Sequence, residues 1–330
     1  IISFALLLIP TILMGGTLPV LSKYIIKHTK QIGEKLGILY SINTAGACIG
    51  SFASTFILIG WLGVSNTLYL SVFINLLVAI AAIILNQKIY NAEKSNILQK
   101  EYVSDEIKTT NIENQKLNST TTNSRLFLLL FFLSGFAAMA AEVLWIRIFT
   151  PFTGTSIYSY TFILLIFLIG ISIGSYLYKT KSNKISDSAK TLIIIELFIA
   201  LLTLLILKLP GWLDNLAYWL LSNKHLTNAI LINVLILALL FTYLLIITIC
   251  YGFIFPLFSK IIINKTNNIT FDIGRVYAVN TFGNIFGSFI CSFFMIQFLG
   301  VAYSLIFIAL ISFIINILLV CKNIKNINLT

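Results

Sequence analysis

The sequence predicts an all-α, polytopic membrane protein, and three observations lead to this fold class. Of the 330 residues, 58% are hydrophobic and only 10% are charged, whereas a soluble domain carries about 25% charged residues. Stretches of about 20 apolar residues, which is the length that crosses a bilayer as a helix, recur along the chain. These stretches lack the ten-residue alternation of a transmembrane β-barrel. A soluble globular enzyme is therefore excluded.

Nine apolar stretches are expected to cross the membrane as helices. In chain order they are residues 1–22, 36–61, 65–86, 126–147, 157–178, 191–208, 228–259, 276–298 and 302–320. The seventh is too long for one straight span and contains Pro256. We therefore expect it to be kinked or to extend into the cytoplasm.

The basic residues of the loops predict the orientation of the chain. If the first span starts outside, 19 of the 22 lysines and arginines fall in the loops of the inner side. Because cytoplasmic loops carry the excess of basic residues, this asymmetry predicts an inner-membrane protein with a cytoplasmic C-terminus. The formal net charge of +11 thus reports topology, and the expected partner is the lipid bilayer and not nucleic acid.

Two polar segments interrupt the spans. Residues 87–125 are rich in Asn, Lys, Glu, Ser and Thr without hydrophobic periodicity, and we expect a cytoplasmic linker or a partner-binding segment there. Residues 210–223 place Trp212 and Trp219 on one face of a short helix, as in an aromatic anchor or a substrate lid at the outer interface. Residues 321–330 form a cytoplasmic tail.

An internal repeat relates the two ends of the chain. Residues 15–64 match residues 252–301 at a constant offset of 237, with 21 identities in 50 positions and no gap. Many identities are glycine, proline or polar residues, which an apolar composition alone does not supply. The motif positions are Gly15, Pro19, Tyr40, Thr44, Gly46 and Gly50 in the first copy and Gly252, Pro256, Tyr277, Thr281, Gly283 and Gly287 in the second.

The spacing of the repeat predicts the architecture. Six spans separate equivalent positions, so both copies cross the membrane in the same direction. Parallel repeats of this kind relate the two halves of major facilitator transporters. Residues 126–320 then form a complete six-span copy, and residues 1–86 form the last three spans of the other copy. The expected fold is a major-facilitator-like 6+6 arrangement with its first half truncated, and three further spans are expected before Ile1.

The repeated motif predicts close helix packing. Its two small-xxx-small pairs, Gly46 with Gly50 and Gly283 with Gly287, allow helix backbones to approach where lipid provides no hydrophobic drive. Asn43 and Asn280, each followed by a threonine, place polar groups inside the membrane. These side chains are expected either to hydrogen-bond between helices or to line a ligand path at the twofold axis.

Three charged residues within or beside the spans are further ligand-path candidates. Glu196 lies about 9 Å past Lys190 on a helix, so it can either snorkel to the interface or have a functional role. Glu142 is expected near the outer boundary, five residues before Arg147, and the two do not share a helix face. They are expected to be interfacial anchors, or Glu142 to line a cavity that suits a cationic ligand.

Sequence motifs for catalysis, cofactors and metals are missing. The two histidines lie in different loops, and the four cysteines lie in or beside apolar runs without CxxC spacing. The sequence contains no Gly-rich strand-to-helix loop for a nucleotide and no nucleophile elbow. We therefore expect no catalytic residue, no cofactor and no metal site.

Two longer motifs suggest a family. They are S-G-F-A-A-M-A-A-E-V-L-W-I-R at Ser134–Arg147 and F-L-I-G-I-S-I-G-S at Phe167–Ser175. With the paired G-x-x-x-P-x-x-S-K and N-T-x-G segments, they resemble the membrane portion of bacterial fused spermidine synthase-like proteins. The resemblance implies a cytoplasmic aminopropyltransferase domain as partner and a polyamine as ligand. The chain departs from that pattern because it contains no such catalytic domain.

The leading functional hypothesis is therefore a membrane domain of the spermidine synthase-like family. It would tether or serve a polyamine-related activity, and bind or move a polyamine or another small cation. The alternatives are a free-standing secondary transporter of the major facilitator type and a membrane scaffold without transport.

Overall fold

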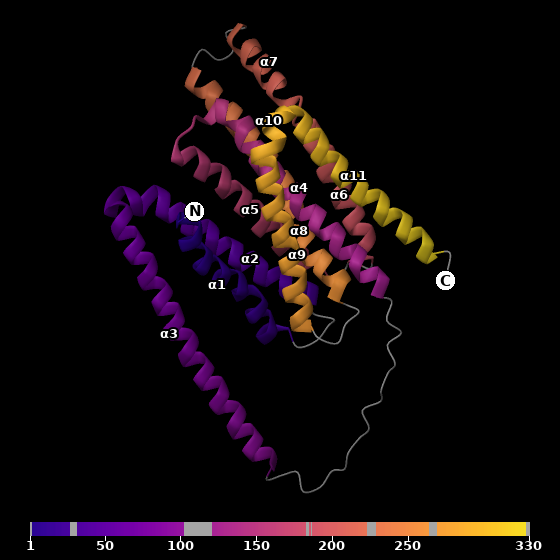
Figure 1. Cartoon of the computed structure of the whole chain (residues 1–330). Coiled ribbons are helices and arrows are strands. Elements are labelled where there is room, and N and C mark those ends of the chain that lie inside the picture. Colours follow the sequence, from indigo (N-terminus) through magenta and orange to yellow (C-terminus); the bar gives the residue numbers. More distant parts are fainter. Residues whose placement is uncertain are drawn as a thin grey trace. The chain divides into compact units, whose positions relative to one another are not determined.

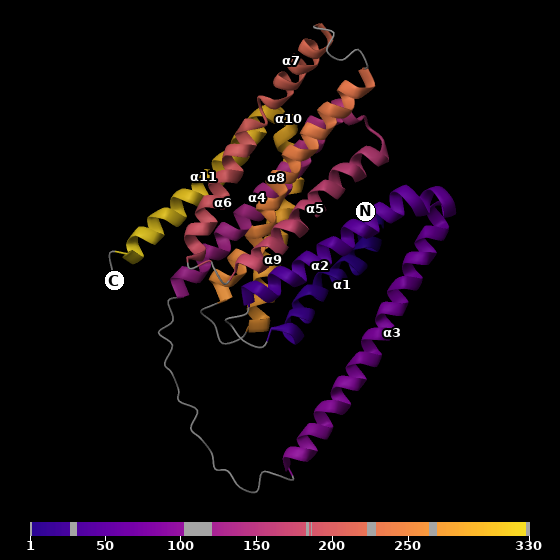
Figure 2. The same cartoon turned by 180° about the vertical axis from the view of Figure 1, so that it is seen from behind.

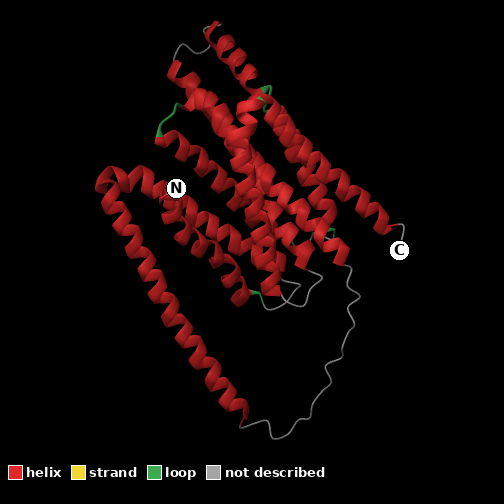
Figure 3. Ribbon diagram, viewed as in Figure 1, coloured by secondary structure: helices red, strands yellow, loops and turns green. Residues whose placement is uncertain are grey.

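The computed structural model is built of helices, and no strand occurs in its described residues (Figure 3). These are residues 2–26, 32–101, 121–182, 185, 187–222, 229–263 and 269–327. The chain divides into two compact units, residues 1–51 with 121–330 and residues 52–120. The fold class predicted from the sequence is confirmed.

The first unit contains most of the helices (Figures 1 and 2). They are α1 (Ile2–Ile25), α2 (Ile32–Phe52), α4 (Thr121–Thr153), α5 (Ile157–Lys181), α6 (Ser188–Leu205), α7 (Leu209–Ser222), α8 (Ala229–Ile263), α9 (Ile269–Ile290), the π-helix η3 (Cys291–Met295), α10 (Ile296–Phe298) and α11 (Gly300–Ile327). The second unit contains the π-helix η2 (Ala53–Leu58) and α3 (Ile59–Glu101).

Seven helical runs in the described residues are long and apolar enough to cross a membrane, and α1 adds a shorter apolar stretch, Leu8–Ser22. The longest run, Ile32–Gln87, has 56 residues and covers two of the nine expected spans. Its backbone is interrupted at Gly63, which has a φ of 73°. Because glycine lacks a Cβ, it adopts this left-handed conformation without steric cost. The expected division between residues 61 and 65 therefore corresponds to a real break in the helix.

The internal repeat is visible in the backbone. Gly300, which is 237 residues after Gly63, has a φ of 76°, so the same left-handed glycine recurs at the offset found in the sequence. The π-helices η2 and η3, each the part of its repeat that follows the N-T-x-G motif, recur at nearly the same offset. Equal local sequences thus produce equal interruptions of two helices far apart in the chain.

The pairs α4–α9 and α5–α8 are packed most closely in the first unit (Figures 1 and 2). A Cβ added at Gly283 or Gly287 of α9 would overlap the carbonyl oxygens of Phe132 and Phe136 of α4. In the other pair, Gly174 of α5 lies against the backbone of α8. Backbone contact of this kind needs small residues at the crossing point, as the motif predicts.

The equivalent glycines of the first repeat make no such contact. Gly15, Gly46 and Gly50 correspond to Gly252, Gly283 and Gly287, but no atom of the described residues lies within 4 Å of a Cβ built on any of the first three. In the second repeat α9 packs on α4 and α8 packs on α5. No described helix packs in the same way on α2 or on α1, which correspond to α9 and α8. The same motif is packed in one repeat and open in the other.

Some boundaries differ from the expectation. Helix α3 continues to Glu101 and α4 begins at Thr121. Both ends of the expected linker 87–125 are therefore helical. Residues 88–101 include Ala, Glu, Lys, Leu and Gln, which extend a helix readily once it has formed. Residues 102–120 lie outside the described residues. Helix α8 continues through Pro256, and the short helix expected at 210–223 is α7.

Candidate functional site

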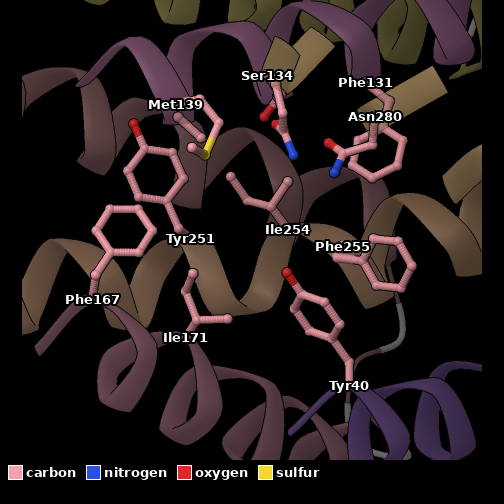
Figure 4. A pocket seen from close by; sticks show the side chains of 13 residues that line it. Tyr40, Phe131, Ser134, Met139, Phe167, Ile171, Tyr251, Ile254, Phe255 and Asn280 are labelled. Atoms are coloured by element: carbon pink, nitrogen blue, oxygen red, sulfur yellow. The ribbon is translucent and has the colours of Figure 1, made fainter. Parts of the chain in front are cut away.

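A cavity of about 80 Å³ lies between α2, α4, α5, α8 and α9 (Figure 4). Because a water molecule needs roughly 10–15 Å³ of such space, the cavity holds several waters or one small molecule. Its lining residues are Tyr40, Phe131, Ser134, Gly135, Ala138, Met139, Phe167, Ile171, Tyr251, Ile254, Phe255, Asn280 and Asn284. None of these side chains carries a formal charge.

Aromatic rings form two opposite sides of the cavity. On one side the ring of Phe255 stacks on Tyr40, with centroids 4.7 Å apart, and lies 6.0 Å from Phe131. On the other side Phe167 stacks on Tyr251 at 6.5 Å. Figure 4 shows the two groups apart from one another, with Ile171 and Ile254 between them in this view. The cavity is therefore bordered by aromatic rings on more than one side.

The third side of the cavity is polar and comes from α4 and α9. The side-chain oxygens of Asn280 and Asn284 both lie within 2.8 Å of the position that a Cβ on Gly135 would occupy. The absence of a side chain at Gly135 leaves room for both carboxamides. Within the described residues neither carboxamide makes a hydrogen bond, so both are available to a ligand.

The buried carboxyl group of Glu196 contacts this polar side through Ser134. The hydroxyl of Ser134 donates a hydrogen bond of 2.7 Å to Oε1 of Glu196, which is only 1% exposed. The side chain of Ser312 on α11 also lies close to the Glu196 carboxyl group. Helices α4, α6 and α11 are thus joined by a polar cluster one hydrogen bond away from the cavity.

Two buried donors beside the cavity have no partner in the described part of the chain. They are the hydroxyl of Tyr251 and Nε1 of Trp145, whose rings lie 6.1 Å apart. A buried polar group without a hydrogen bond costs about 1–3 kcal/mol, so native proteins satisfy such groups with water, an ion or a ligand. Among the described residues, the Tyr251 hydroxyl and Nε1 of Trp145 are therefore two unsatisfied donors packed behind the aromatic side of the cavity.

The cavity lies beside a contact between the two repeats. On α2, Ser41 donates to the carbonyl of Ser172 over 2.9 Å, and Ser172 of α5 donates to the carbonyl of Ser41 over 3.0 Å. Gly37 continues this contact, since its Cβ would stand 3.1 Å from the Ser175 carbonyl. Helix α2 belongs to the first repeat and α5 to the six-span second repeat.

Comparison with known proteins agrees with this architecture. A family model described as Major Facilitator Superfamily matches residues 2–267. The chain belongs to the Major Facilitator Superfamily. No curated protein and no solved structure matches it significantly. The match covers most of the chain, and together with the apolar helices it supports a membrane transporter of this superfamily.

This finding corrects the family drawn from the sequence motifs. The resemblance to spermidine synthase-like proteins is wrong, because the family model that matches is that of the Major Facilitator Superfamily. The motifs that suggested the resemblance are mainly small and aromatic residues at helix contacts, and such packing patterns arise in many membrane proteins. The polyamine ligand and the aminopropyltransferase partner depended on that resemblance and have no support.

The two asparagines of the repeat have different environments in this superfamily member. Asn280 lines the cavity, whereas its counterpart Asn43 is exposed on α2 and is not among the lining residues. The threonines next to them neither hydrogen-bond to another helix in the described residues nor line the cavity. Thr44 and Thr281 each bond the backbone carbonyl four residues earlier, at Tyr40 and Tyr277, within their own helices.

The structure brings only one of the three charged candidates to the site. Glu196 is buried at the α4–α6–α11 junction, so it does not snorkel to the interface. Glu142 is half-buried and Arg147 is exposed, and no described hydrogen bond or ion pair involves either. Neither residue lines the cavity.

Sequence reasoning missed most of the cavity. Asn284 lies four residues after Asn280 and so shares its helix face, a spacing that could have identified it. Ser134 precedes the glycine that admits both asparagines, but nothing in the sequence indicates that relationship. Phe131, Tyr251 and Phe255 lie in long apolar runs and have no distinguishing pattern.

Proposed function

We propose that the cavity is the site through which this transporter moves a small organic molecule across the membrane. One observation carries the proposal. Tyr40 belongs to the first repeat, and all other lining residues belong to the six-span second repeat. In transporters built from repeats, substrate sites lie at the interface between the repeats, near the middle of the bilayer.

The chemistry of the cavity supports the same role. Binding sites for small molecules are mostly apolar and aromatic, with a few polar groups that fix orientation. Here the aromatic sides enclose Asn280, Asn284 and Ser134. Of the candidates from the sequence, Asn280 is proposed to contact the ligand, and Glu196 is proposed as a positioning residue that acts through Ser134.

The contact between α2 and α5 suits an alternating-access mechanism. Rocking of one repeat against the other would expose the cavity first to one side of the membrane and then to the other. In the proposed orientation the protein lies in the inner membrane with its C-terminus in the cytoplasm, because the basic residues concentrate on that side.

Accessibility of the cavity from both sides tests the proposed function without knowledge of the substrate. Ala138 lines the cavity and would be replaced by cysteine in a protein whose four native cysteines are alanine. Two small membrane-impermeant methanethiosulfonates, one bearing a sulfonate and one a trimethylammonium group, would be applied to right-side-out and to inverted vesicles. We expect Ala138→Cys to react from both faces with at least one reagent.

Two control variants make the result specific. Ala140→Cys lies on the same helix at a position that is 0% exposed, and Ala238→Cys lies on the outer surface of α8 in the hydrocarbon region. Neither is expected to react. Labelling of Ala138→Cys from one face only, or from none, would contradict a transport role for this cavity.

A further inference from the structure

We infer that the cavity binds a small organic cation, an ammonium compound held between the aromatic rings and the oxygens of Asn280, Asn284 and Ser134. This inference rests on the proposed function, since it concerns the ligand of the same cavity. It names a chemical class that the family match alone does not supply.

The lining of the cavity disfavours an anionic ligand. No lysine, arginine or histidine is among the lining residues. An anion entering the cavity would lose its hydration without gaining a charged partner, and the loss of hydration is costly in an apolar environment. The carboxyl group of Glu196 is hydrogen-bonded to the lining residue Ser134. The surroundings therefore oppose a negative ligand.

The hydrogen bond of Ser134 leaves an acceptor at the cavity. Its hydroxyl uses its only hydrogen in the bond to Glu196, so what it offers the cavity is its oxygen lone pairs. The carboxamides of Asn280 and Asn284 lie beside it at Gly135, and each has an acceptor oxygen as well as an NH2 donor. This side of the cavity can therefore accept from a ligand donor or contact a cation.

The rings that border the cavity favour a cation. A cation over an aromatic face is attracted by the ring quadrupole, most strongly when the cation is desolvated. Tyr40 and Phe255 lie on one side and Phe167 and Tyr251 on the other (Figure 4). Rings on two sides with acceptor oxygens on a third would surround an ammonium group.

The hydroxyl of Tyr251 does not define the ligand. It has no partner in the described residues, but the oxygen is fully buried and so is closed off from the cavity space. The ligand is therefore defined by its cation, and choline, a small quaternary ammonium compound, serves as the probe.

The test compares three probes of similar shape on the purified full chain in detergent, by isothermal titration calorimetry. They are choline, the neutral isostere in which a carbon replaces the ammonium nitrogen, and dimethylbutanoate as the anion. We expect choline to bind at least about tenfold more tightly than the isostere, because a desolvated cation–π contact and tenfold in affinity are of similar size. The anion is expected to show no binding.

A variant of the cavity and a matched control at the repeat-related position test the site of binding. Asn280→Leu removes one of the acceptor oxygens and is expected to reduce the preference for choline over the isostere severalfold. Asn43→Leu makes the same change at the repeat-related position outside the cavity and is expected to leave the preference unchanged. Should Asn280→Leu fail to fold, Phe255→Leu tests the aromatic contribution in its place.

Equal or tighter binding of the neutral isostere, preference for the anion, or no binding of any probe would overturn the inference. Labelling of Ala138→Cys from both faces would in each case leave the proposed transport function standing. If Asn43→Leu and Asn280→Leu reduce the preference equally, the cavity is not the cation site.

Discussion

Ser41 and Ser172 exchange hydrogen bonds across the boundary between the repeats, each hydroxyl donating to the other residue's backbone carbonyl. Their Oγ atoms are 3.3 Å apart. Such reciprocal bonding requires the backbones of α2 and α5 to approach closely, and Gly37 permits this approach one turn away. The pair therefore marks a point at which the two repeats are held together in this conformation.

Cross-linking Ser41 and Ser172 as cysteines is expected to stop the cavity from opening alternately to the two sides of the membrane. The Oγ separation is compatible with a disulfide between Ser41→Cys and Ser172→Cys, whose Cβ atoms must lie about 3.5–4.5 Å apart. In the cysteine-free background with Ala138→Cys, we expect oxidation to restrict labelling to one face. A parallel sample reduced before labelling should react from both faces. Unchanged two-sided labelling of the cross-linked protein would show that α2 and α5 do not separate.

The repeat-related glycines are expected to differ in their tolerance of a methyl group. Gly283→Ala places a Cβ against the Phe132 carbonyl, so it should lower the free energy of unfolding by about 1–3 kcal/mol through overpacking. Gly46→Ala meets nothing within 4 Å in the described structure and should leave stability nearly unchanged. Thermal unfolding in detergent measures both. An equal loss would show that another helix packs on Gly46 in the protein.

Removal of the Glu196 carboxyl group is expected to destabilise the α4–α6–α11 junction. Glu196→Ala leaves the hydroxyl of Ser134 without its acceptor, at a cost of about 1–3 kcal/mol for a buried group left unsatisfied. Glu196→Gln keeps an acceptor oxygen and should cost less. Glu142→Ala is the control, since no described hydrogen bond involves that residue. Equal unfolding temperatures for Glu196→Ala and Glu142→Ala would contradict a structural role for the cluster.

The orientation of the chain is expected to follow its basic residues. A green fluorescent protein fused after Thr330 should fluoresce, and alkaline phosphatase fused there should be inactive, because the tail is predicted to be cytoplasmic. Phosphatase fused after Ser222, at the end of α7, should be active. The opposite pattern at both sites would invert the topology, and with it the assignment of the two faces in the vesicle experiments.

The sequence alone predicted the features that depend on local composition and spacing. The apolar runs predicted the helical membrane fold, because an uncharged stretch of this length can satisfy its backbone in lipid only as a helix. The offset of 237 residues pairs Gly63 with Gly300, and the two share a left-handed backbone conformation because equal local sequences have equal backbone preferences. Asn280, a ligand-path candidate because of its place in the repeated motif, lines the cavity.

The motifs were a poorer guide to the family and to the site. Glycines at helix crossings and aromatic residues in apolar runs report close packing, and packing is common to many membrane proteins. The family suggested by these motifs was consequently wrong. Asn284 could have been found from its spacing to Asn280, whereas Phe131 and Tyr251 could not.

Only the tertiary structure separated residues that are alike in sequence. Asn43 and Asn280 occupy the same motif, yet Asn280 meets Gly135 of α4 at the cavity, whereas Asn43 is exposed among the described helices. Glu196 became a buried partner of Ser134 because α4, α6 and α11 converge on it. Helical periodicity determines which residues share a face of one helix. Which other helix covers that face depends on contacts between segments far apart in the chain, and those contacts decided where the cavity lies.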